Sequence, residues 1–456
     1  MQESQLDEYI RRKQNRVLEE SEIETQNFND LCQRIKTAFF DDWQNQDNSS
    51  LSLEIQRKAI IGYEKEKDFF KNRIYELLKA FNALNTEYPT YYVDLVDAIY
   101  NELWGLAGMA EWFYENYKES SSAKIIGENI FFMIDGKMKL MPQKISEERK
   151  AQLIKAIMLA TPEERMDKDY YEMYMLDGTR VTVFIEPMAK KSQACLIFRR
   201  YIIPSLSFEE QARRGTIPEA IIPALKSMVS VGYNVIFMGA VRTAKTTFLS
   251  TWQSYEDPNL EGVMVETDPE IPLHNILPNA PIIQLIADGQ DLSSISKNLL
   301  RSDADYFIMA EARDGIALDT AMRIASKGTK RMKITVHSRN PYQLALEAAM
   351  EISNTVGGNV EIIANKFASS FDYIFHFIQL KDKSQKRLKG IYEMTIDAKG
   401  KMKMTEILSY DVSHNTWSIV NKISDDKKLY GLESNEEAFK SFRKELKKLS
   451  ELGVLS

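Results

Sequence analysis

The stretch that most constrains the fold is residues 234–253, NVIFMGAVRTAKTTFLSTWQ. It begins with an apolar run from Val235 to Met238, whose length and β-branched or aromatic character favour a buried strand. Gly239 and a turn of small residues follow, and Lys245 opens an apolar segment that has the length of a helix. A strand, a loop and a helix in this order are the context that a phosphate-binding loop requires.

The spacing in this loop matches the pattern G-x-x-x-x-G-K-[ST] except that Ala244 replaces the second glycine. In an intact loop, backbone N–H groups surround the phosphates, the lysine contacts the β and γ phosphates, and the hydroxyl binds magnesium. Lys245 and Thr246 are the candidates for these two roles. The alternative without nucleotide binding is an ordinary strand-to-helix turn with a surface lysine. The candidate nucleotide-binding residues are Gly239, Arg242, Thr243, Ala244, Lys245, Thr246 and Thr247.

The composition argues against several classes of protein. The 456 residues include 59 Lys and Arg against 66 Asp and Glu, a formal net charge of −7, so the basic face expected of a nucleic-acid partner is not indicated. The two cysteines, Cys32 and Cys195, form no CxxC pair, which suits a reducing cytoplasm and excludes a disulfide framework or a cysteine zinc site. From the polar N-terminus and the lack of long apolar runs, we expect neither a secretory signal nor a membrane span.

Beyond the loop, three predicted strands end in polar residues. Glu266 ends GVMVE with Glu270 shortly after it, Glu311 follows YFIMA, and His337 follows KITV. Ligands of a parallel α/β sheet bind outside the carboxyl ends of its strands, so we expect these side chains and the loop to converge on one crevice. Hydrolysis of a phosphoanhydride needs neutralised phosphate charge, bound magnesium and an aligned water, and this set offers a candidate for each. Taken singly, the carboxylates can instead cap helices, and the histidine can be structural.

The pattern of apolar and polar residues changes along the chain. Short alternating stretches with Asp-Gly turns, such as YEMYMLDGTRVTVFIEPM, indicate antiparallel strands upstream of the loop. The expected segments are an N-terminal helical region (1–115), which is a bundle or an adaptor, an α+β domain (116–205), a linker (206–225), an α/β domain (226–415) and a C-terminal extension with an amphipathic helix (416–456).

The order of the motifs resembles that of the type II and type IV secretion traffic ATPases, most closely the branch that drives tight-adherence pilus assembly and type IV secretion. The loop resembles the family's Walker A, VETDPEIP its Asp box (typically IEDTxEL), RSDADYFIMAEARDG its Walker B (typically RPDxIIxGEVRG) and TVHS its His box (typically TxHA). MLDGTRV and LIFRRY resemble strands of the family's N-terminal domain. The resemblance implies the α/β fold class, with a RecA-like P-loop ATPase domain after a small α+β domain and an N-terminal helical region.

The resemblance also implies roles for the matching residues. Lys245 and Thr246 would bind phosphate and magnesium. Glu311 would be the Walker B carboxylate and a magnesium ligand, and His337 would be the His-box residue.

Four further residues take roles from the same resemblance. Glu266, with Glu270 as the alternative, would be the catalytic carboxylate of the Asp box. Arg180 and Arg200 align with N-terminal-domain arginines that reach the nucleotide and act in catalysis.

The loop departs from the family pattern. Where the family reads GGTGSGKT, this chain reads GAVRTAKT, so Ala240, Arg242 and Ala244 stand at glycine positions. Glycine is used there because the loop adopts positive φ angles, and an alanine costs on the order of 1 kcal/mol in that conformation. Ala310 also replaces a glycine of Walker B, and Thr329 a histidine that precedes the His box. The phosphate and magnesium ligands are kept.

The function implied by the resemblance is an ATPase, with ATP and Mg²⁺, that couples ATP binding and hydrolysis to domain motion for protein secretion or pilus assembly. Its expected location is the cytoplasm, with peripheral association at the inner face of the cell membrane left open. The expected partners are further copies of the chain, as a hexamer, and an integral membrane platform protein, with no nucleic acid. The altered loop supports the alternative, a nucleotide-binding ring or scaffold subunit with weak or no turnover.

Overall fold

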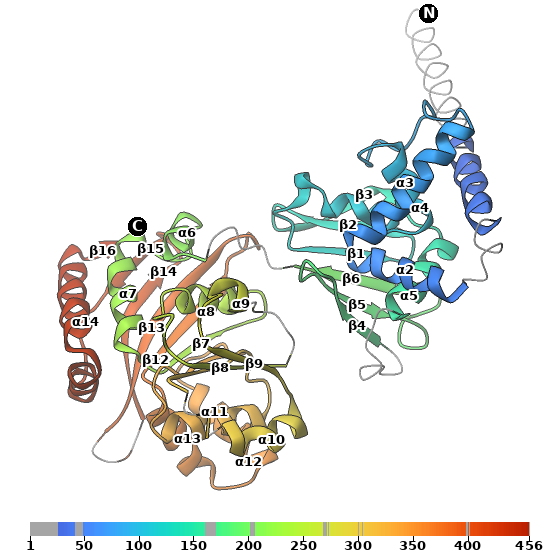
Figure 1. The fold of residues 1–456 in the computed structure, drawn as a ribbon. Coiled ribbons are helices and arrows are strands. Elements are labelled where there is room, and N and C mark those ends of the chain that lie inside the picture. The colour runs from blue at the N-terminus through green and yellow to red at the C-terminus, as the bar shows by residue number, and fades with distance from the viewer. Residues whose placement is uncertain are drawn as a thin grey trace, which may run out of the picture. The chain divides into compact units, whose positions relative to one another are not determined.

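The chain forms two compact units in the computed structural model, Met1–Ile202 and Ile203–Ser456 (Figure 1). Among the residues described, no helix is both long enough and apolar enough to cross a bilayer. The structure describes residues 26–41, 49–159, 170–200, 206–267, 271, 273–299, 301–302, 304–397, 400 and 402–455.

The first unit combines helices with an antiparallel sheet. The sheet order is β3-β2-β1-β6-β5-β4, and the predicted turn Asp135-Gly136 joins β2 to β3 with positive φ at both residues, as a tight hairpin requires. Its helices are residues 26–41, α2 (Ser49–Ile61), α3 (Glu64–Ala80), α4 (Leu95–Leu103), the 3₁₀ turns η1 (Ala107–Phe113) and η2 (Glu115–Tyr117), and α5 (Glu147–Leu159). Its strands are β1 (Ser122–Ile126), β2 (Asn129–Ile134), β3 (Lys137–Lys144), β4 (Tyr170–Tyr174), β5 (Arg180–Phe184) and β6 (Cys195–Arg199).

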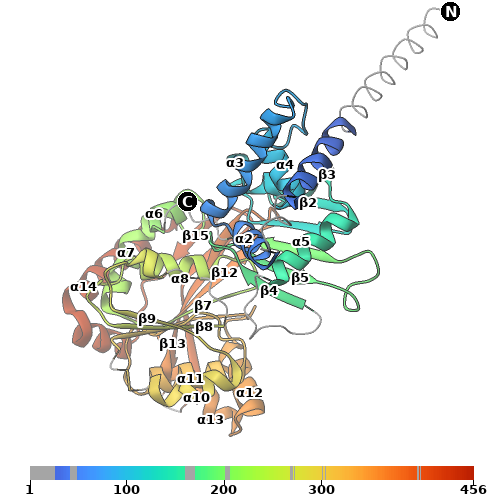
Figure 2. The same cartoon turned by 45° about the vertical axis from the view of Figure 1, so that its right-hand side comes forward.

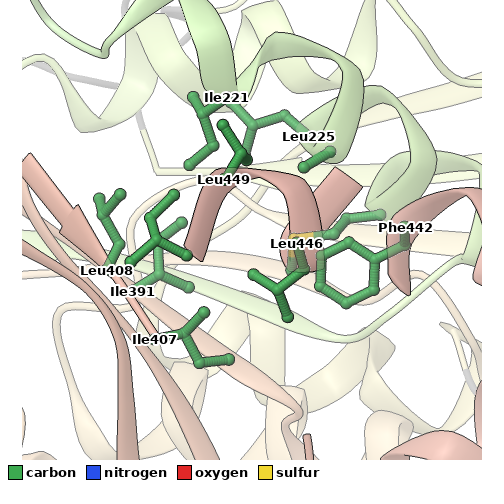
Figure 3. Close-up of a pocket in the computed structure, with 11 residues that line it drawn as sticks. Ile221, Leu225, Ile391, Ile407, Leu408, Phe442, Leu446 and Leu449 are labelled. Atoms are coloured by element: carbon green, nitrogen blue, oxygen red, sulfur yellow. The ribbon is translucent and has the colours of Figure 1, made fainter. Parts of the chain in front are cut away.

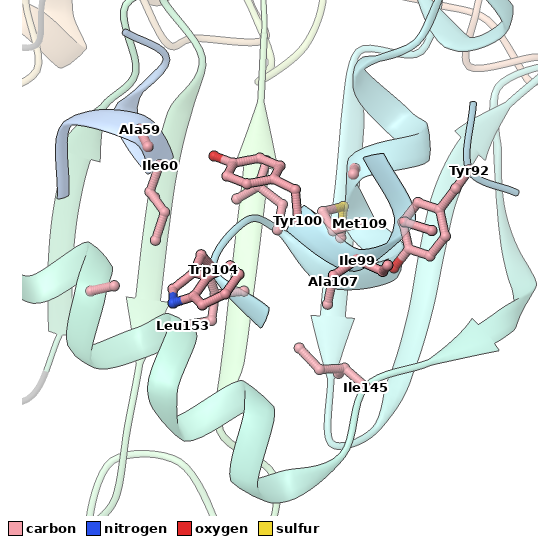
Figure 4. Close-up of a cluster of buried hydrophobic side chains, with 14 of the residues drawn as sticks. Ala59, Ile60, Tyr92, Ile99, Tyr100, Trp104, Ala107, Met109, Ile145 and Leu153 are labelled. Carbon is pink, nitrogen blue, oxygen red and sulfur yellow. The ribbon is translucent and has the colours of Figure 1, made fainter. Parts of the chain in front are cut away.

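One hydrophobic core holds the helices and the sheet of this unit together. Trp104 lies at its centre, with its ring 4.4 Å from that of Phe39 and 5.1 Å from that of Phe70. Figure 4 shows Trp104 between helices of this core, with Leu153 of α5 close by. Buried residues of the strands, such as Phe132, belong to the same cluster. The helical region and the strands therefore stabilise each other by shared apolar burial.

The second unit is built on a ten-stranded sheet in the order β16-β15-β14-β13-β12-β7-β11-β10-β8-β9. The strands from β12 to β9 in this order are parallel, and β13 to β16 extend the sheet with antiparallel pairs. The strands are β7 (Val235–Gly239), β8 (Gly262–Glu266), β9 (Ile282–Ile286), β10 (Tyr306–Met309), β11 (Lys333–Val336), β12 (Tyr373–Gln379), β13 (Lys386–Ile396), β14 (Met402–Asp411), β15 (Thr416–Ile419) and β16 (Val454–Leu455).

Helices cover both faces of this sheet, which explains why β7 is apolar throughout. Val235 and Phe237 face a core shared with α7, α8 and α14, whereas Ile236 and Met238 face a core shared with α10 to α13. Figures 1 and 2 show α10 to α13 grouped on one side. The predicted α/β class, a parallel-sheet domain after a smaller α+β domain, is confirmed. The helices are α6 (Phe208–Arg213), the 3₁₀ turn η4 (Glu219–Ile221), α7 (Ile222–Val231), α8 (Lys245–Gln253), α9 (Leu273–Ile276), α10 (Gly289–Leu299), α11 (Gly315–Ser326), α12 (Leu344–Thr355), α13 (Val360–Ser370) and α14 (Asp425–Leu452).

The terminal helix α14 is amphipathic, as its spacing predicted, and packs on the second unit. Phe442 and Leu446 are buried against α7 and β13 to β15. Between them lies a small apolar cavity of about 10 Å³, which Figure 3 shows with Ile221 and Leu225 on its far wall. A void of this size is at the limit for one water, and no polar group lines it. It is a packing defect and not a ligand site.

Candidate functional site

The strand order of the second unit brings the predicted site residues together at the carboxyl ends of neighbouring parallel strands. β11 lies between β7 and β10, and β8 lies on the other side of β10. Met238 is in register with Val336, and Met309 with both Ile334 and Val265. The loops that follow these parallel strands therefore start at the same edge, and they carry Lys245, His337, Glu311 and Glu266.

The loop after β7 has the backbone of a glycine-rich turn although it contains little glycine. Arg242 has φ 66° and Ala244 has φ 71°, so two of the three positions expected to need glycine are left-handed. Each non-glycine residue there costs on the order of 1 kcal/mol. The loop is closed by the Thr243 hydroxyl, which donates to the carbonyl oxygen of Ala240 at 2.8 Å.

The start of α8 offers donors to an anion. Ala244 occupies the N-cap position and provides no side-chain hydrogen bond to the first turn, which contains Lys245, Thr246 and Thr247. Backbone N–H groups at a helix N-terminus have no partner within the helix, and they attract negative charge. Gly239 adds a close approach, because a Cβ there would lie 2.4 Å from the carbonyl oxygen of Phe377. These features fit a phosphate group.

We expect Gly239→Ala to lower the free energy of unfolding by about 2–4 kcal/mol, since it combines a steric clash with a φ of 151°. Gly328→Ala is the matched control, because Gly328 also has positive φ but no atom lies within 4 Å of its added Cβ. The control should lower the free energy of unfolding by about 1 kcal/mol, which is the cost of a positive φ for a residue with a Cβ. Chemical denaturation of both variants measures the difference. Equal losses would contradict a tightly packed loop.

Lys245, His337 and Glu311 form a chain of polar contacts. The buried Lys245 Nζ donates to the Ala240 carbonyl oxygen at 2.9 Å and lies 3.3 Å from His337 Nδ1. His337 Nε2 lies 2.9 Å from Glu311 Oε1. An ammonium group can only donate, so Nδ1 accepts and Nε2 carries the hydrogen that His337 donates to Glu311. The lysine of the loop and the carboxylate after β10 are therefore linked through one imidazole.

Glu311 is held ionised by its neighbours. Burial would raise the pKa of this carboxyl, but the hydrogen bonds from His337 and Arg313 outweigh burial and keep the pKa below its ordinary value. Arg313 reaches Glu311 Oε2 at 2.6 Å. Glu311 also has φ 109°, a conformation that is strained for a residue with a side chain. Sequence reasoning gave Arg313 no role, and its position two residues after the carboxylate was the available signal.

The second candidate carboxylate, Glu266, ends β8 and is buried. One of its oxygens accepts the backbone N–H of Ile271 at 2.9 Å, so it orders the chain that follows the strand. Ile271 precedes the start of α9 at Leu273, so this contact orders the segment between β8 and α9 and is not a helix cap. Glu270, the alternative carboxylate, lies outside the described residues. Thr246 is half-buried in the first turn of α8.

The two candidate arginines belong to the first unit and have partners there. Arg180 binds Glu172, with 2.9 Å between Nε and Oε1. Arg200 donates to the carbonyl oxygens of Ser120 and Trp112, each at 3.0 Å, and its guanidinium lies 4.0 Å from the centre of the Trp112 ring. Burial lowers the pKa of Arg200. To contact a nucleotide, either arginine would exchange these partners.

A buried ion pair that the sequence did not reveal lies at the amino ends of the parallel strands, opposite the candidate site. Lys333, the first residue of β11, is fully buried, and its Nζ lies 2.8 Å from Glu256 Oε1. Arg331 also binds Glu256, and the Lys333 ammonium lies 4.6 Å from the centre of the Tyr306 ring. Burial lowers the pKa of Lys333 despite the carboxylate. The pair joins β11 to the segment after α8 and is structural.

The proteins found by comparison with known sequences and structures agree with the family that the motifs resemble. No protein-family model matches the chain. It is 26% identical over 196 residues to the probable conjugal transfer protein TrbB of Sinorhizobium fredii (strain NBRC 101917 / NGR234), which covers 41% of this chain and 58% of TrbB. The match thus spans less than two thirds of that relative.

Solved structures resemble the chain at lower identity. The ATPase DotB of Legionella pneumophila is 15% identical, with a TM-score of 0.43 and coverage of 76% of this chain and 92% of DotB. The pilus retraction motor PilT, solved with bound ADP, is 13% identical, with a TM-score of 0.44 and coverage of 74% and 91%.

Proposed function

The chain resembles the type IV secretion traffic ATPases, and we propose that it is a Mg²⁺-dependent ATPase that couples ATP binding and hydrolysis to domain motion for protein secretion or pilus assembly. The observation that carries this proposal is the chain of contacts from Lys245 through His337 to Glu311, beside the uncapped N-terminus of α8. It supports the proposal because a terminal phosphate bound at the start of α8 would meet a cation, an imidazole and an ionised carboxylate.

Phosphate binding would use groups that are already oriented. The N–H groups of the first turn of α8 bind phosphate oxygens, and Lys245 exchanges the Ala240 carbonyl for a phosphate oxygen. Thr246 and Glu311 would hold Mg²⁺, which when bound neutralises phosphate charge. Among the described residues there is no group of three or more His, Cys, Asp or Glu side chains that could hold a metal. A magnesium ion bound mainly through nucleotide phosphates and water needs only one or two protein ligands, so the donor set fits.

Catalysis would rest on the carboxylates. Glu311, kept ionised by His337 and Arg313, orients water through its oxygens, and Glu266 or Glu270 is the second carboxylate that positions the attacking water. Once Lys245 moves toward the phosphates, Nδ1 of His337 would face the γ phosphate and would donate to it after taking up a proton, since an unprotonated ring nitrogen only accepts. Loss of the γ phosphate then changes the contacts of Lys245, His337 and Glu311 together.

The work of the protein would depend on other subunits. We place it as a homo-oligomer, a hexamer in the resemblance, at the cytoplasmic face of a membrane with an integral platform protein as partner. Arg180 and Arg200 would leave Glu172 and the carbonyl groups of the first unit to reach the nucleotide. Such an exchange of partners would link phosphate charge to the position of the first unit.

The second candidate function is a nucleotide-binding ring or scaffold subunit with weak or no turnover. It is favoured by the strain at the site, because Arg242, Ala244 and Glu311 all have positive φ. Strain of this kind costs about 1–3 kcal/mol at each residue, and contacts with a bound nucleotide could offset it without any hydrolysis.

Phosphate release from Mg-ATP by the full chain tests the proposal, with Lys245→Ala beside it. We expect the parent to turn over and Lys245→Ala to lose at least about 10²-fold in rate, as for removal of one group that stabilises transition-state charge. Lys297→Ala, an exposed lysine of α10, is the matched control and should keep the parental rate. If the parent binds nucleotide through Lys245 without turnover, the scaffold function replaces the ATPase. If the parent binds no nucleotide, both functions are wrong.

A further inference from the structure

A second cavity in the second unit has a different chemical character from the candidate site. It has a volume of about 450 Å³ and is lined by residues of β13, β14, the segment after β15, and both the first turn and the second half of α14. Hydroxyl groups, one amide and one isoleucine line part of it, and four cations line the rest: Lys403, Lys422, Lys428 and Arg443. We call this cavity the cationic pocket. It shares no residue with the phosphate-binding loop.

The positive charge of the cationic pocket is not neutralised by acidic side chains in its lining. Among the described residues that line it there is no carboxylate, although the chain as a whole has a net charge of −7. Lys428 pairs with Asp425, whose side chain is 98% exposed, so solvent screens that pair strongly. For Lys403, Lys422 and Arg443 the described part of the chain contains no ion pair. Water screens the exposed cations Lys403, Lys422 and Arg443 as it screens the pair of Lys428, and a bound anion would lower the like-charge repulsion that remains.

The nearest buried carboxylate is already engaged elsewhere. Glu393 of β13 accepts the backbone N–H of Ser424 at 3.0 Å and the Tyr373 hydroxyl at 3.3 Å, and it is 1% exposed. It therefore holds the segment that leads into α14 instead of neutralising the pocket. The walls are regular structure, since Thr395 of β13 is in register with Lys403 of β14. The cations of β14 and α14 are thus carried on hydrogen-bonded elements.

We propose that the cationic pocket binds a phosphate-bearing anion with at least two negative charges. Lysine ammonium groups and an arginine fork both bind phosphate, and the hydroxyls of Thr395, Thr405 and Ser424 add neutral donors for its several oxygens. A carboxylate offers only two oxygens and one charge, which fits a set of four cations less well. The volume admits a group as large as an oligophosphate.

Two sources of such a ligand are distinguishable, a soluble oligophosphate and the headgroup of an anionic lipid. Exposed apolar side chains lie next to pocket-lining residues in the sequence, among them Val420 at 44% exposed and Leu429 at 58%. These residues are sequence neighbours of the pocket segment and of Lys428. Such side chains would enter the interfacial region of a bilayer if the phosphate belonged to a lipid.

The first arm of the test is calorimetric titration of the full chain with tripolyphosphate. All proteins carry Lys245→Ala, which weakens the phosphate-binding loop. We expect the added pair Lys422→Ala and Arg443→Ala to raise the Kd at least about tenfold, because two charge-assisted hydrogen bonds are lost. Lys444→Ala, an exposed cation next to Arg443 that does not line the pocket, is the control and should leave the Kd unchanged.

The second arm is sedimentation with phosphatidylcholine vesicles that contain or lack phosphatidylglycerol. Binding to the anionic vesicles alone, lost in the Lys422→Ala and Arg443→Ala variant, supports the pocket with a lipid source. Loss of tripolyphosphate binding in the same variant supports a soluble source. The proposal is wrong if neither probe binds, or if Lys444→Ala weakens binding as much as the pocket pair. The result does not depend on ATP turnover, so the two proposals can fail separately.

Discussion

Glu311→Gln is expected to lower the rate of Mg-ATP hydrolysis by about 10²–10⁴-fold, the range typical of a positioned acid–base group. The amide keeps the size of the side chain and can still accept the hydrogen bond that His337 donates at 2.9 Å. It loses the negative charge that Arg313 and His337 maintain. The variant removes the interactions of an ionised carboxylate with water and magnesium, and it also removes the ion pair with Arg313, because the amide nitrogen cannot accept a hydrogen bond. Single-turnover phosphate release gives the rate of the chemical step.

Nucleotide affinity separates this effect from a loss of binding. We expect Glu311→Gln to bind ATP within a few-fold of the parent, whereas Lys245→Ala should lose affinity. Glu361→Gln replaces an exposed glutamate in the first turn of α13 and should keep the parental rate. A parental rate in Glu311→Gln would contradict a catalytic role for this carboxylate and leave Glu266 or Glu270 as the candidate.

Glu256→Gln is expected to destabilise the second unit by about 3–5 kcal/mol, the cost of leaving one partner of a buried ion pair uncompensated. Lys333 is fully buried, and Glu256 is the carboxylate that the structure pairs with it. Glutamine has nearly the same shape, so a cavity does not explain the loss. The shift of the urea unfolding transition of the second unit measures it.

Two further variants identify the cause of that loss. Glu436→Gln removes an exposed ion pair of α14 with Lys440 and should leave the unfolding transition unchanged. Combining Glu256→Gln with Lys333→Met removes both buried charges, and we expect most of the lost stability to return. If the double variant is as unstable as Glu256→Gln alone, the unpaired ammonium is not the cause.

Local sequence was enough to predict the strand, loop and helix at residues 235–253. An apolar run buried on both faces, a small-residue turn and an apolar helix are short-range features, and each is found as expected. The left-handed backbone at Arg242 and Ala244 was implied by the family resemblance, since both occupy positions where that family has glycine. The gathering of Glu266, Glu311 and His337 at one edge follows from the geometry of any parallel sheet.

Strand order and partner choice were decided only by the tertiary structure. β12 is parallel to β7 on one side and antiparallel to β13 on the other, and no local feature of its sequence distinguishes the two partners. The contact between Lys245 and His337 requires β11 to pair with β7. Strand pairing joins segments distant in sequence, and short apolar strands carry little information about which neighbour they select.

The same reason explains the polar partners that the sequence left hidden. Lys333 begins an apolar strand, and its carboxylate, Glu256, is 77 residues earlier in the chain. Arg200 directly follows β6, which resembles a nucleotide-contacting element, yet its guanidinium donates to a carbonyl group 80 residues upstream. The residue types that carry charge and chemistry can be read locally. Which of them meet, and whether they meet a ligand or each other, depends on long-range packing.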